Sequence, residues 1–451
     1  MPIHIFTGPT AVKEVARETI PGCRIHPPAQ HGDFIRNRFS SKDIVLLIDG
    51  LYHTSPPIRH KEILESISRG ATVIGASSMG ALRASELHTF GMIGVGKIFE
   101  YYRDGVIEGD DEVAVLHTAG PEWKVLSEAL VNMRHTLAAA RLTGVITETE
   151  KEGLLAVARS LHYPRRSWRA VLQACEQQDP SLREAAGRVL GFHQENGPDA
   201  NLKYQDACTG LRYAHALAEG ASPPHGKQAD DWPAGWQTTY LRKWNREFTG
   251  DVQDGRFVST AQQLDFQRLF GPDQPQRWRR YVLSAMAGLT ADAPLAELEE
   301  QSLSAAHAME LSCASIPDGQ MRHWLTGSEQ EQLTEQEKLL TVLVRSSRLT
   351  ADLSDGPAAR WLLPQAERNR ALISSSLHIN EQVAASSFSK HIDHLKKSVL
   401  EKHLRLIWGL PADAAIDLAA RERGFASTAE AAEALRPFFL KDYNDRRQNG
   451  A

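Results

Sequence analysis

Two short runs of aliphatic residues constrain the fold of this chain most. Residues 44–48 read IVLLI and residues 72–76 read TVIGA, and turn-forming residues or serines follow each run. Unbroken apolar runs of this length are typical of strands that are buried on both faces. A third run covers residues 3–6, and residues 58–69 carry apolar side chains at helical spacing. This order predicts an α/β layer with parallel strands.

The chain has 451 residues, which is enough for more than one domain. Residues 1–150 are expected to form an α/β domain with a parallel sheet, and residues 151–220 a helical extension. Ala221–Trp236 is rich in Pro, Gly and Asp and is the expected linker. Residues 237–451 are expected to form a mostly α-helical C-terminal domain, because candidate capping boxes recur there. These boxes pair Ser328 with Glu331, Thr334 with Glu337, and Ser427 with Glu430.

Composition excludes several classes of protein. A net charge of −5 and a pI near 6.4 do not suit a nucleic-acid-binding protein, which normally shows a basic patch. The four cysteines contain no CxxC pair, so neither a structural zinc site nor a disulfide framework is expected. The N-terminus lacks a signal-peptide pattern, and no apolar run approaches the roughly 20 residues of a membrane span. A cytoplasmic location without a membrane partner is therefore expected.

The segment from residue 71 to residue 87 reads as a buried strand, a tight turn at Ser77 and Ser78, and then a helix. This is the layout of a nucleophile elbow, in which small residues flank a serine on a sharp strand-to-helix turn. Ser78 is the candidate nucleophile, and the backbone N–H groups of Met79 and Gly80 are the candidate oxyanion donors. The alternative is that one of the two serines only caps the helix.

Lys61 is the candidate general base for this serine. It lies at the edge of the apolar stripe of its predicted helix, because Ile58 and Leu64 are each three residues away. Partial desolvation lowers the pKa of a lysine and makes it usable as a base, which a serine nucleophile requires. The alternatives are a surface lysine whose stem covers the core, or His60 as the base.

Three other motifs have simpler structural explanations. Residues 91–97 read GMIGVGK, which resembles a phosphate-binding loop, but Ile98 replaces the required hydroxyl, so a glycine-rich turn is expected. Asp110–Glu112 is expected to form a turn or a helix cap rather than a metal site. Arg83 and Glu86 are one helical turn apart and are expected to form an ion pair, although Arg83 could instead position a carboxylate near the elbow.

Seven segments in the first third of the chain form a recognisable series. They are PPAQHGD (27–33), LLIDGLYH (46–53), HKEIL (60–64), GASSMGALRASEL (75–87), FGMIGVGKIFEYYRDG (90–105), DDEVAV (110–115) and SEALVNMR (127–134). These segments resemble the TfuA-like family and occur in the order expected for it. Tyr52 and Ser85 stand where Phe and Ala are expected, and neither change affects the proposed site.

The resemblance implies a function beside YcaO enzymes, which use ATP to activate a peptide amide so that sulfur replaces the backbone oxygen. It implies that the chain hydrolyses the thiocarboxylate of a ThiS-like ubiquitin-fold sulfur carrier and assists binding of a precursor peptide. The implied Ser–Lys pair falls on Ser78 and Lys61, with Ser77, His60, Arg83 and Glu86 in supporting positions. Neither a metal nor an organic cofactor is implied.

Two other functions remain open from the sequence. The first is a non-enzymatic adaptor that docks the YcaO enzyme and its peptide, with Ser78 serving as a helix cap. The second is a generic acyl hydrolase that acts on small esters or amides. If the chain is the hydrolase, the region from residue 150 to residue 451 is expected to dock the YcaO partner and handle the substrate.

Overall fold

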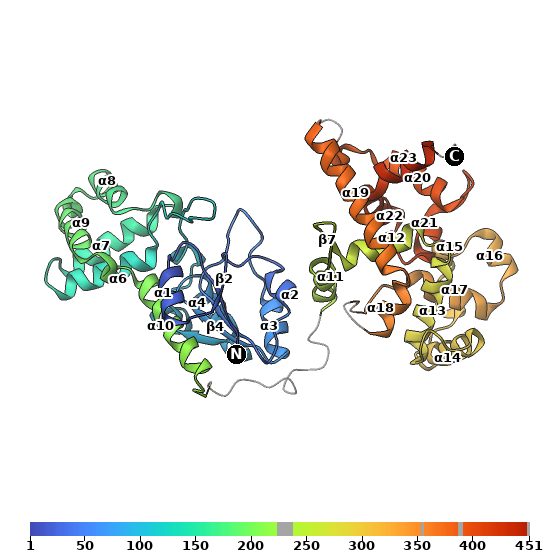
Figure 1. Cartoon of the computed structure of the whole chain (residues 1–451), viewed down its shortest axis with the longest axis horizontal. Coiled ribbons are helices and arrows are strands. Elements are labelled where there is room, and N and C mark those ends of the chain that lie inside the picture. Colours follow the sequence, from blue (N-terminus) through green and yellow to red (C-terminus); the bar gives the residue numbers. More distant parts are fainter. Residues whose placement is uncertain (223–237, 352, 354–355, 387–390, 449–451) are drawn as a thin grey trace. The chain divides into compact units, whose positions relative to one another are not determined.

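In a computed structural model of the chain, the described residues are 1–222, 238–351, 353, 356–386 and 391–448. The chain divides into two compact units, residues 1–236 and 237–451 (Figure 1). Most of the linker that the sequence predicts at Ala221–Trp236 lies outside the described residues.

The first unit is built on a five-stranded parallel sheet with the strand order β2-β1-β3-β4-β5. The three strands predicted from the apolar runs are confirmed. The sequence missed both edge strands, β2 and β5, because they are only three residues long and are not fully buried. The strands are β1 (Ile3–Phe6), β2 (Arg24–His26), β3 (Ile44–Leu47), β4 (Thr72–Ala76) and β5 (Ile93–Val95).

Helices cover both faces of this sheet, so the central strands are buried on each side. In β3, Val45 and Leu47 enter the core on one face, while Ile44 and Leu46 enter the core on the other. The first core includes residues of α2, α3, α4 and α5, and the second includes residues of α1 and α10 (Figure 1). These helices are α1 (Lys13–Thr19), α2 (Asp33–Asn37), α3 (His60–Ser68), α4 (Met79–Leu87), α5 (Lys97–Arg103) and α10 (Leu202–Ala218).

Helix α10 shows that the α/β unit uses residues well beyond 150. Ala207, Leu211 and Ala214 are fully buried, and α10 packs against β3 and β4. Gly210 allows this close approach, because a Cβ atom there would lie 2.9 Å from the Cβ of Ala76. One face of the sheet is therefore covered by a helix that is more than 100 residues away in sequence from the strands it covers.

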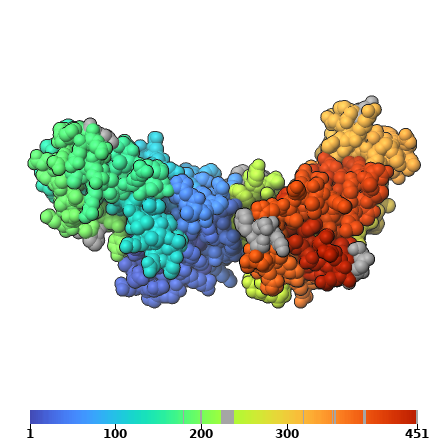
Figure 2. Space-filling view, turned by 90° about the horizontal axis from the view of Figure 1, so that it is seen from above, coloured from blue at the N-terminus to red at the C-terminus, as the bar shows by residue number. Residues whose placement is uncertain are grey.

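Four helices between the sheet region and α10 form a core of their own, separate from the two cores on the sheet faces. Each helix contributes buried residues to it, for example Leu137, Leu154, Val171 and Val189. In Figure 2 these helices, coloured turquoise to green, form a lobe beside the blue surface of the α/β layer. They are α6 (Leu130–Leu142), α7 (Glu148–Ser160), α8 (Trp168–Gln178) and α9 (Arg183–Asn196).

The second unit is mostly helical, as the sequence predicts, and its described residues form one β-hairpin, β6 (Gly250–Gln253) and β7 (Arg256–Ser259). Its helices are α11 (Thr239–Phe248), α12 (Thr260–Phe270), α13 (Gln274–Ala287), α14 (Leu295–Ala308), α15 (Asp318–Trp324), α16 (Gly327–Gln332), α17 (Glu335–Ser346), α18 (Pro357–Leu362), α19 (Ala366–Ser386), α20 (Lys397–Trp408), α21 (Ile416–Glu422), α22 (Thr428–Leu435) and α23 (Phe439–Gln448).

The predicted capping boxes are only partly correct. The box of Thr334 with Glu337 forms at the start of α17. The box expected at Ser328 is wrong, since Thr326 caps α16 and pairs with Glu329 instead. Ser427 caps α22 through its hydroxyl, which accepts from the Glu430 amide. Across the described residues, every helix is too short or too polar to cross a membrane.

Close packing of α4 against the sheet depends on two glycines. A Cβ atom on Gly80 would lie 1.8 Å from the carbonyl oxygen of Leu47 in β3. A Cβ atom on Gly75 would lie 2.1 Å from the carbonyl oxygen of Gly80. Since the obstructing atoms belong to the backbone, no side chain can move aside to make room at either position. These glycines therefore set the distance between α4 and the strands.

Substitution of Gly80 tests this constraint. Gly80→Ala should lower the free energy of unfolding by about 3 kcal/mol, because the added methyl group displaces α4 from β3. Gly187→Ala is the matched control, since Gly187 lies inside α9 with open space around its Cβ position. It should stabilise the chain by about 0.5–1 kcal/mol through helix propensity. Both variants should shift the same transition in urea unfolding, and equal effects would contradict the packing argument.

Candidate functional site

The turn between β4 and α4 is strained at Ser77. This residue has a φ of 68°, which belongs to the left-handed region that a serine rarely adopts. Its side chain is fully buried, and its Oγ atom makes no hydrogen bond with the described residues. Strained backbone and an unpaired buried hydroxyl each cost free energy, and such features concentrate at functional sites.

Ser78 follows as the N-cap residue of α4, with φ −94° and ψ −124°. Its carbonyl oxygen accepts from the amides of Ala81 and Leu82, but its side chain makes no capping hydrogen bond. The alternative in which its hydroxyl serves as a helix cap is therefore wrong for this structure. Ser78 remains 8% exposed, whereas Ser77 has no exposed surface. The strained backbone is therefore that of Ser77, whereas Ser78 is the one of these two serines that keeps some exposed surface.

The structure corrects one of the two predicted oxyanion donors. The amide of Gly80 donates to the carbonyl oxygen of Ile48 at 3.0 Å, so it is not available to an oxyanion. The physical reason is the close packing of α4 on β3, which brings these backbone groups together. The amide of Met79 makes no hydrogen bond with a described residue and is the remaining candidate donor.

Three of the four predicted supporting residues, His60, Arg83 and Glu86, meet between α3 and α4. The guanidinium of Arg83 lies 2.7 Å from the carboxylate of Glu86, which confirms the predicted ion pair. His60 Nε2 lies 2.8 Å from the same carboxylate, and Arg83 also donates to the carbonyl oxygen of Ile58. Burial raises the pKa of Glu86, but hydrogen bonds from His60 and Arg83 outweigh that effect, and the pKa lies below its ordinary value.

These contacts place the start of α3 beside the second half of α4. Ser78 precedes Arg83 and Glu86 by five and eight residues, which is roughly 8–12 Å along a helix axis. His60 is already paired with the Glu86 carboxylate. Lys61 is half-buried on the first turn of α3. The contact between Lys61 and Ser78 stays a prediction.

The motif at residues 91–97 is not the glycine-rich turn that the sequence predicts, because its central residues form strand β5. The following helix, α5, begins as in a phosphate-binding loop, with Gly96 at a φ of 99°. However, the Asp206 carboxylate accepts from the amides of Lys97 and Ile98 at 3.0 and 2.7 Å. A protein carboxylate therefore occupies the position where such a loop binds phosphate.

The acidic segment Asp110–Glu112 forms a short 3-10 helix, and two of its acids are ion-paired. Arg134 binds the Glu112 carboxylate through two nitrogens at 2.6 and 2.8 Å. The buried guanidinium of Arg166 binds both the carbonyl oxygen and the carboxylate of Asp111. These acids therefore connect the sheet region to the helices of the lobe.

Sequence reasoning missed a carboxylate network at the carboxyl edge of the sheet. The buried Asp49 carboxylate follows β3 and accepts from the amides of Gly8 and Thr10 at 2.8 and 3.0 Å. The hydroxyls of Thr7 and Thr10 donate to it at 3.4 and 2.6 Å. The strand order is that of a doubly wound fold, in which ligands bind where β1 and β3 diverge. Asp49 lies at that point and fixes the loop after β1.

Lys203 is a second residue that sequence reasoning missed. Its side chain is buried in α10, and its Nζ atom donates to the carbonyl oxygen of Val113 at 2.9 Å. Burial lowers the pKa of this ammonium group, while the nearby carboxylates of Asp49 and Glu128 oppose that effect. A sequence signal existed, because Lys203 and Asp206 interrupt the apolar stripe of α10 three residues apart.

Comparison with known proteins identifies the domain that contains this site. The family model described as TfuA-like protein matches residues 49–167. This chain carries a TfuA-like domain. The match contains Ser77, Ser78 and Lys61, but it ends before α10. No curated protein matches the chain. The TfuA-like domain is thus completed by β1, β2, β3 and α10, which all lie outside the matched residues.

Replacement of Ser77 tests the strain in this turn. Ser77→Gly should raise the free energy of unfolding by about 1 kcal/mol, because glycine tolerates positive φ and the unpaired hydroxyl is removed. Ser85→Gly, inside α4, is the matched control and should lower it by about 1 kcal/mol. Urea denaturation of both variants provides the measurement. A destabilised Ser77→Gly variant would show that the turn is not strained.

The buried lysine predicts a pH dependence of stability. Because the pKa of Lys203 is lowered in the folded protein, the unfolded chain binds more protons between that pKa and the ordinary value of about 10.4. Stability should therefore rise with pH as this range is approached, and Lys203→Met should flatten the rise. Urea midpoints between about pH 7 and pH 10 test this. Lys42→Met, at an exposed site, should leave the slope unchanged.

Proposed function

We propose that this chain is an accessory hydrolase in peptide backbone thioamide formation. It releases sulfide from the thiocarboxylate of a ThiS-like sulfur carrier for a YcaO-type partner enzyme. The observation that carries the proposal is the TfuA-like match over residues 49–167, which contains the turn at Ser77 and Ser78. The strained backbone of that turn and the absence of a capping bond from Ser78 support a chemical function for this serine pair.

In the proposed reaction, the Ser78 oxygen forms a bond to the thiocarboxylate carbon and its proton passes to Lys61. The Met79 amide donates to the oxyanion of the tetrahedral intermediate. The C–S bond then breaks, sulfide leaves with a proton, and an acyl ester remains on Ser78. Water hydrolyses this ester and regenerates the serine. The net reaction converts the thiocarboxylate and one water molecule into a carboxylate and hydrogen sulfide, without any change of oxidation state.

A non-enzymatic adaptor is the second candidate, and specific observations favour it. Ser77 is fully buried, the Gly80 amide is already bonded to Ile48, and α3 begins beside the far half of α4. Under this alternative, the TfuA-like domain would bind the YcaO partner and its peptide without cleaving a thiocarboxylate. A generic acyl hydrolase, the third candidate, would act on small thioesters in the absence of a carrier protein.

Substitution of the proposed nucleophile and base tests the hydrolase. Lys61→Met should slow sulfide release from a thiocarboxylated carrier protein by about 10²–10⁴-fold, the usual contribution of a general base. Ser78→Ala should reduce it at least as much, because the nucleophile itself is lost. Ser85→Ala is the matched control on the same helix and should retain full activity. Trapping of released sulfide with a thiol-reactive fluorophore provides the measurement.

The same variants separate the three candidates. In the hydrolase, Ser78→Ala loses sulfide release but still binds the YcaO partner. If the wild-type chain binds that partner but releases no sulfide, the adaptor replaces the hydrolase. If small thioesters are cleaved as fast as the carrier thiocarboxylate, the activity is that of a generic acyl hydrolase.

A further inference from the structure

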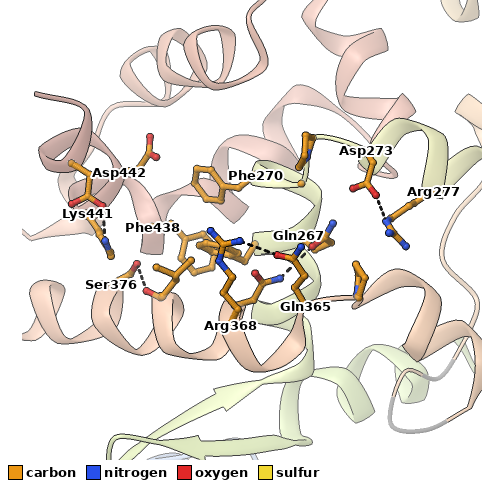
Figure 3. A pocket seen from close by; sticks show the side chains of 17 residues that line it. Gln267, Phe270, Asp273, Arg277, Gln365, Arg368, Ser376, Phe438, Lys441 and Asp442 are labelled. Carbon is orange, nitrogen blue, oxygen red and sulfur yellow. Dashed lines mark hydrogen bonds and ion pairs between the residues drawn. The ribbon is translucent and has the colours of Figure 1, made fainter. Parts of the chain in front are cut away.

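The second unit contains a cavity of about 640 Å³ between α12, α19 and α23 (Figure 3). This volume lies within the range of roughly 300–1,000 Å³ that is typical of ligand sites. Along α19, its lining residues extend from Arg368 to Ser376. Eight residues of helix span roughly 12 Å, which is the length of three or four residues in extended conformation. The cavity thus has room for a short extended segment.

The central part of the cavity is aromatic. The Phe266 ring lies 4.8 Å from the Phe270 ring and 5.4 Å from the Phe438 ring, measured between centroids. Phe438 is buried, whereas Phe266 and Phe270 are only partly covered and keep apolar surface accessible. Leu372 of α19 lines the same region. An aromatic or large aliphatic side chain would bury this surface favourably.

A pair of amide side chains lies next to the aromatic region. The Asn369 amide donates to Gln267 Oε1 at 3.2 Å, and both residues are buried. This bond uses one donor and one acceptor and leaves others available for the N–H and C=O of a peptide group. Gly271 leaves room for the Gln267 amide, because a Cβ atom there would lie 2.3 Å from its nitrogen. A peptide main chain matches this pair of donors and acceptors.

Most charged groups around the cavity are already paired. Arg277 binds Asp273 at 2.6 Å, Lys441 pairs with Asp445, and Asp442 binds both His403 and Arg446. Arg368 forms no ion pair with a described residue, and its guanidinium contacts the Gln365 side chain only at 3.5 Å. Among the described residues that line the cavity, Arg368 is therefore the charged side chain without an oppositely charged partner. A carboxylate would pair with its guanidinium.

We infer that this cavity binds an extended peptide segment with an aromatic or large aliphatic side chain and a carboxylate side chain two residues apart. The apolar side chain covers Phe270, the main chain bonds to Gln267 and Asn369, and the carboxylate binds Arg368. Side chains two residues apart lie on the same side of an extended segment and are separated by roughly 7 Å. The inference is independent of the proposed hydrolase, because the cavity lies outside the TfuA-like match.

Fluorescein-labelled heptapeptides provide the probe, with the sequences Gly-Ser-Glu-Ala-Phe-Ser-Gly and Gly-Ser-Phe-Ala-Glu-Ser-Gly, because either chain direction is compatible with the cavity. Fluorescence anisotropy with the full chain should show saturable binding of at least one peptide below about 1 mM. Replacing its Glu by Gln or its Phe by Ala should each weaken binding by about tenfold. If neither substitution weakens binding of the peptide, the inference is overturned.

A charge exchange then locates the site. Arg368→Glu should weaken binding of the Glu peptide by about tenfold and strengthen binding of the matched Lys peptide. Since Arg368 is exposed, this variant should fold normally. Lys402→Glu, an exposed site on α20, changes the net charge equally and should leave both affinities unchanged. The inference is overturned if no peptide binds, or if Lys402→Glu and Arg368→Glu have equal effects.

Discussion

Direct contact between the backbone of α4 and the backbone of the sheet determines the geometry of the candidate site. Gly75 and Gly80 allow this contact, and the Gly80 amide donates to the Ile48 carbonyl oxygen as a result. To enter a helix so close to its own strand, the chain must turn sharply, and Ser77 takes the positive φ. The same constraint that creates the strained turn therefore removes one of the amides that the turn was expected to offer to an oxyanion.

Protein carboxylates accept hydrogen bonds from two sets of backbone amides at positions where doubly wound folds can bind phosphate. Asp49 binds the loop after β1, and Asp206 binds the first turn of α5. Lys203 lies one helical turn before Asp206 on α10 and interacts with Asp49 across the same edge of the sheet. Internal acids therefore already accept hydrogen bonds from these amides.

The sequence predicts local structure well where burial is complete and poorly where it is partial. The runs at β1, β3 and β4 are buried on both faces, so their apolar pattern is unambiguous. The edge strands β2 and β5 are short and half-buried, and their patterns resemble those of loops. Pairing of Arg83 with Glu86 was predictable because helical spacing alone brings the two side chains together.

What the sequence by itself determined is the set of local features: the central parallel strands, the small residues around Ser77 and Ser78, and the mostly helical second unit. Only the tertiary structure decided the rest. It assigned the strain to Ser77 and bonded the Gly80 amide to Ile48. It also brought α10, with Lys203 and Asp206, onto a sheet more than 100 residues away. The physical reason is that periodicity records the burial of each element, whereas hydrogen bonds between distant residues depend on how the elements pack.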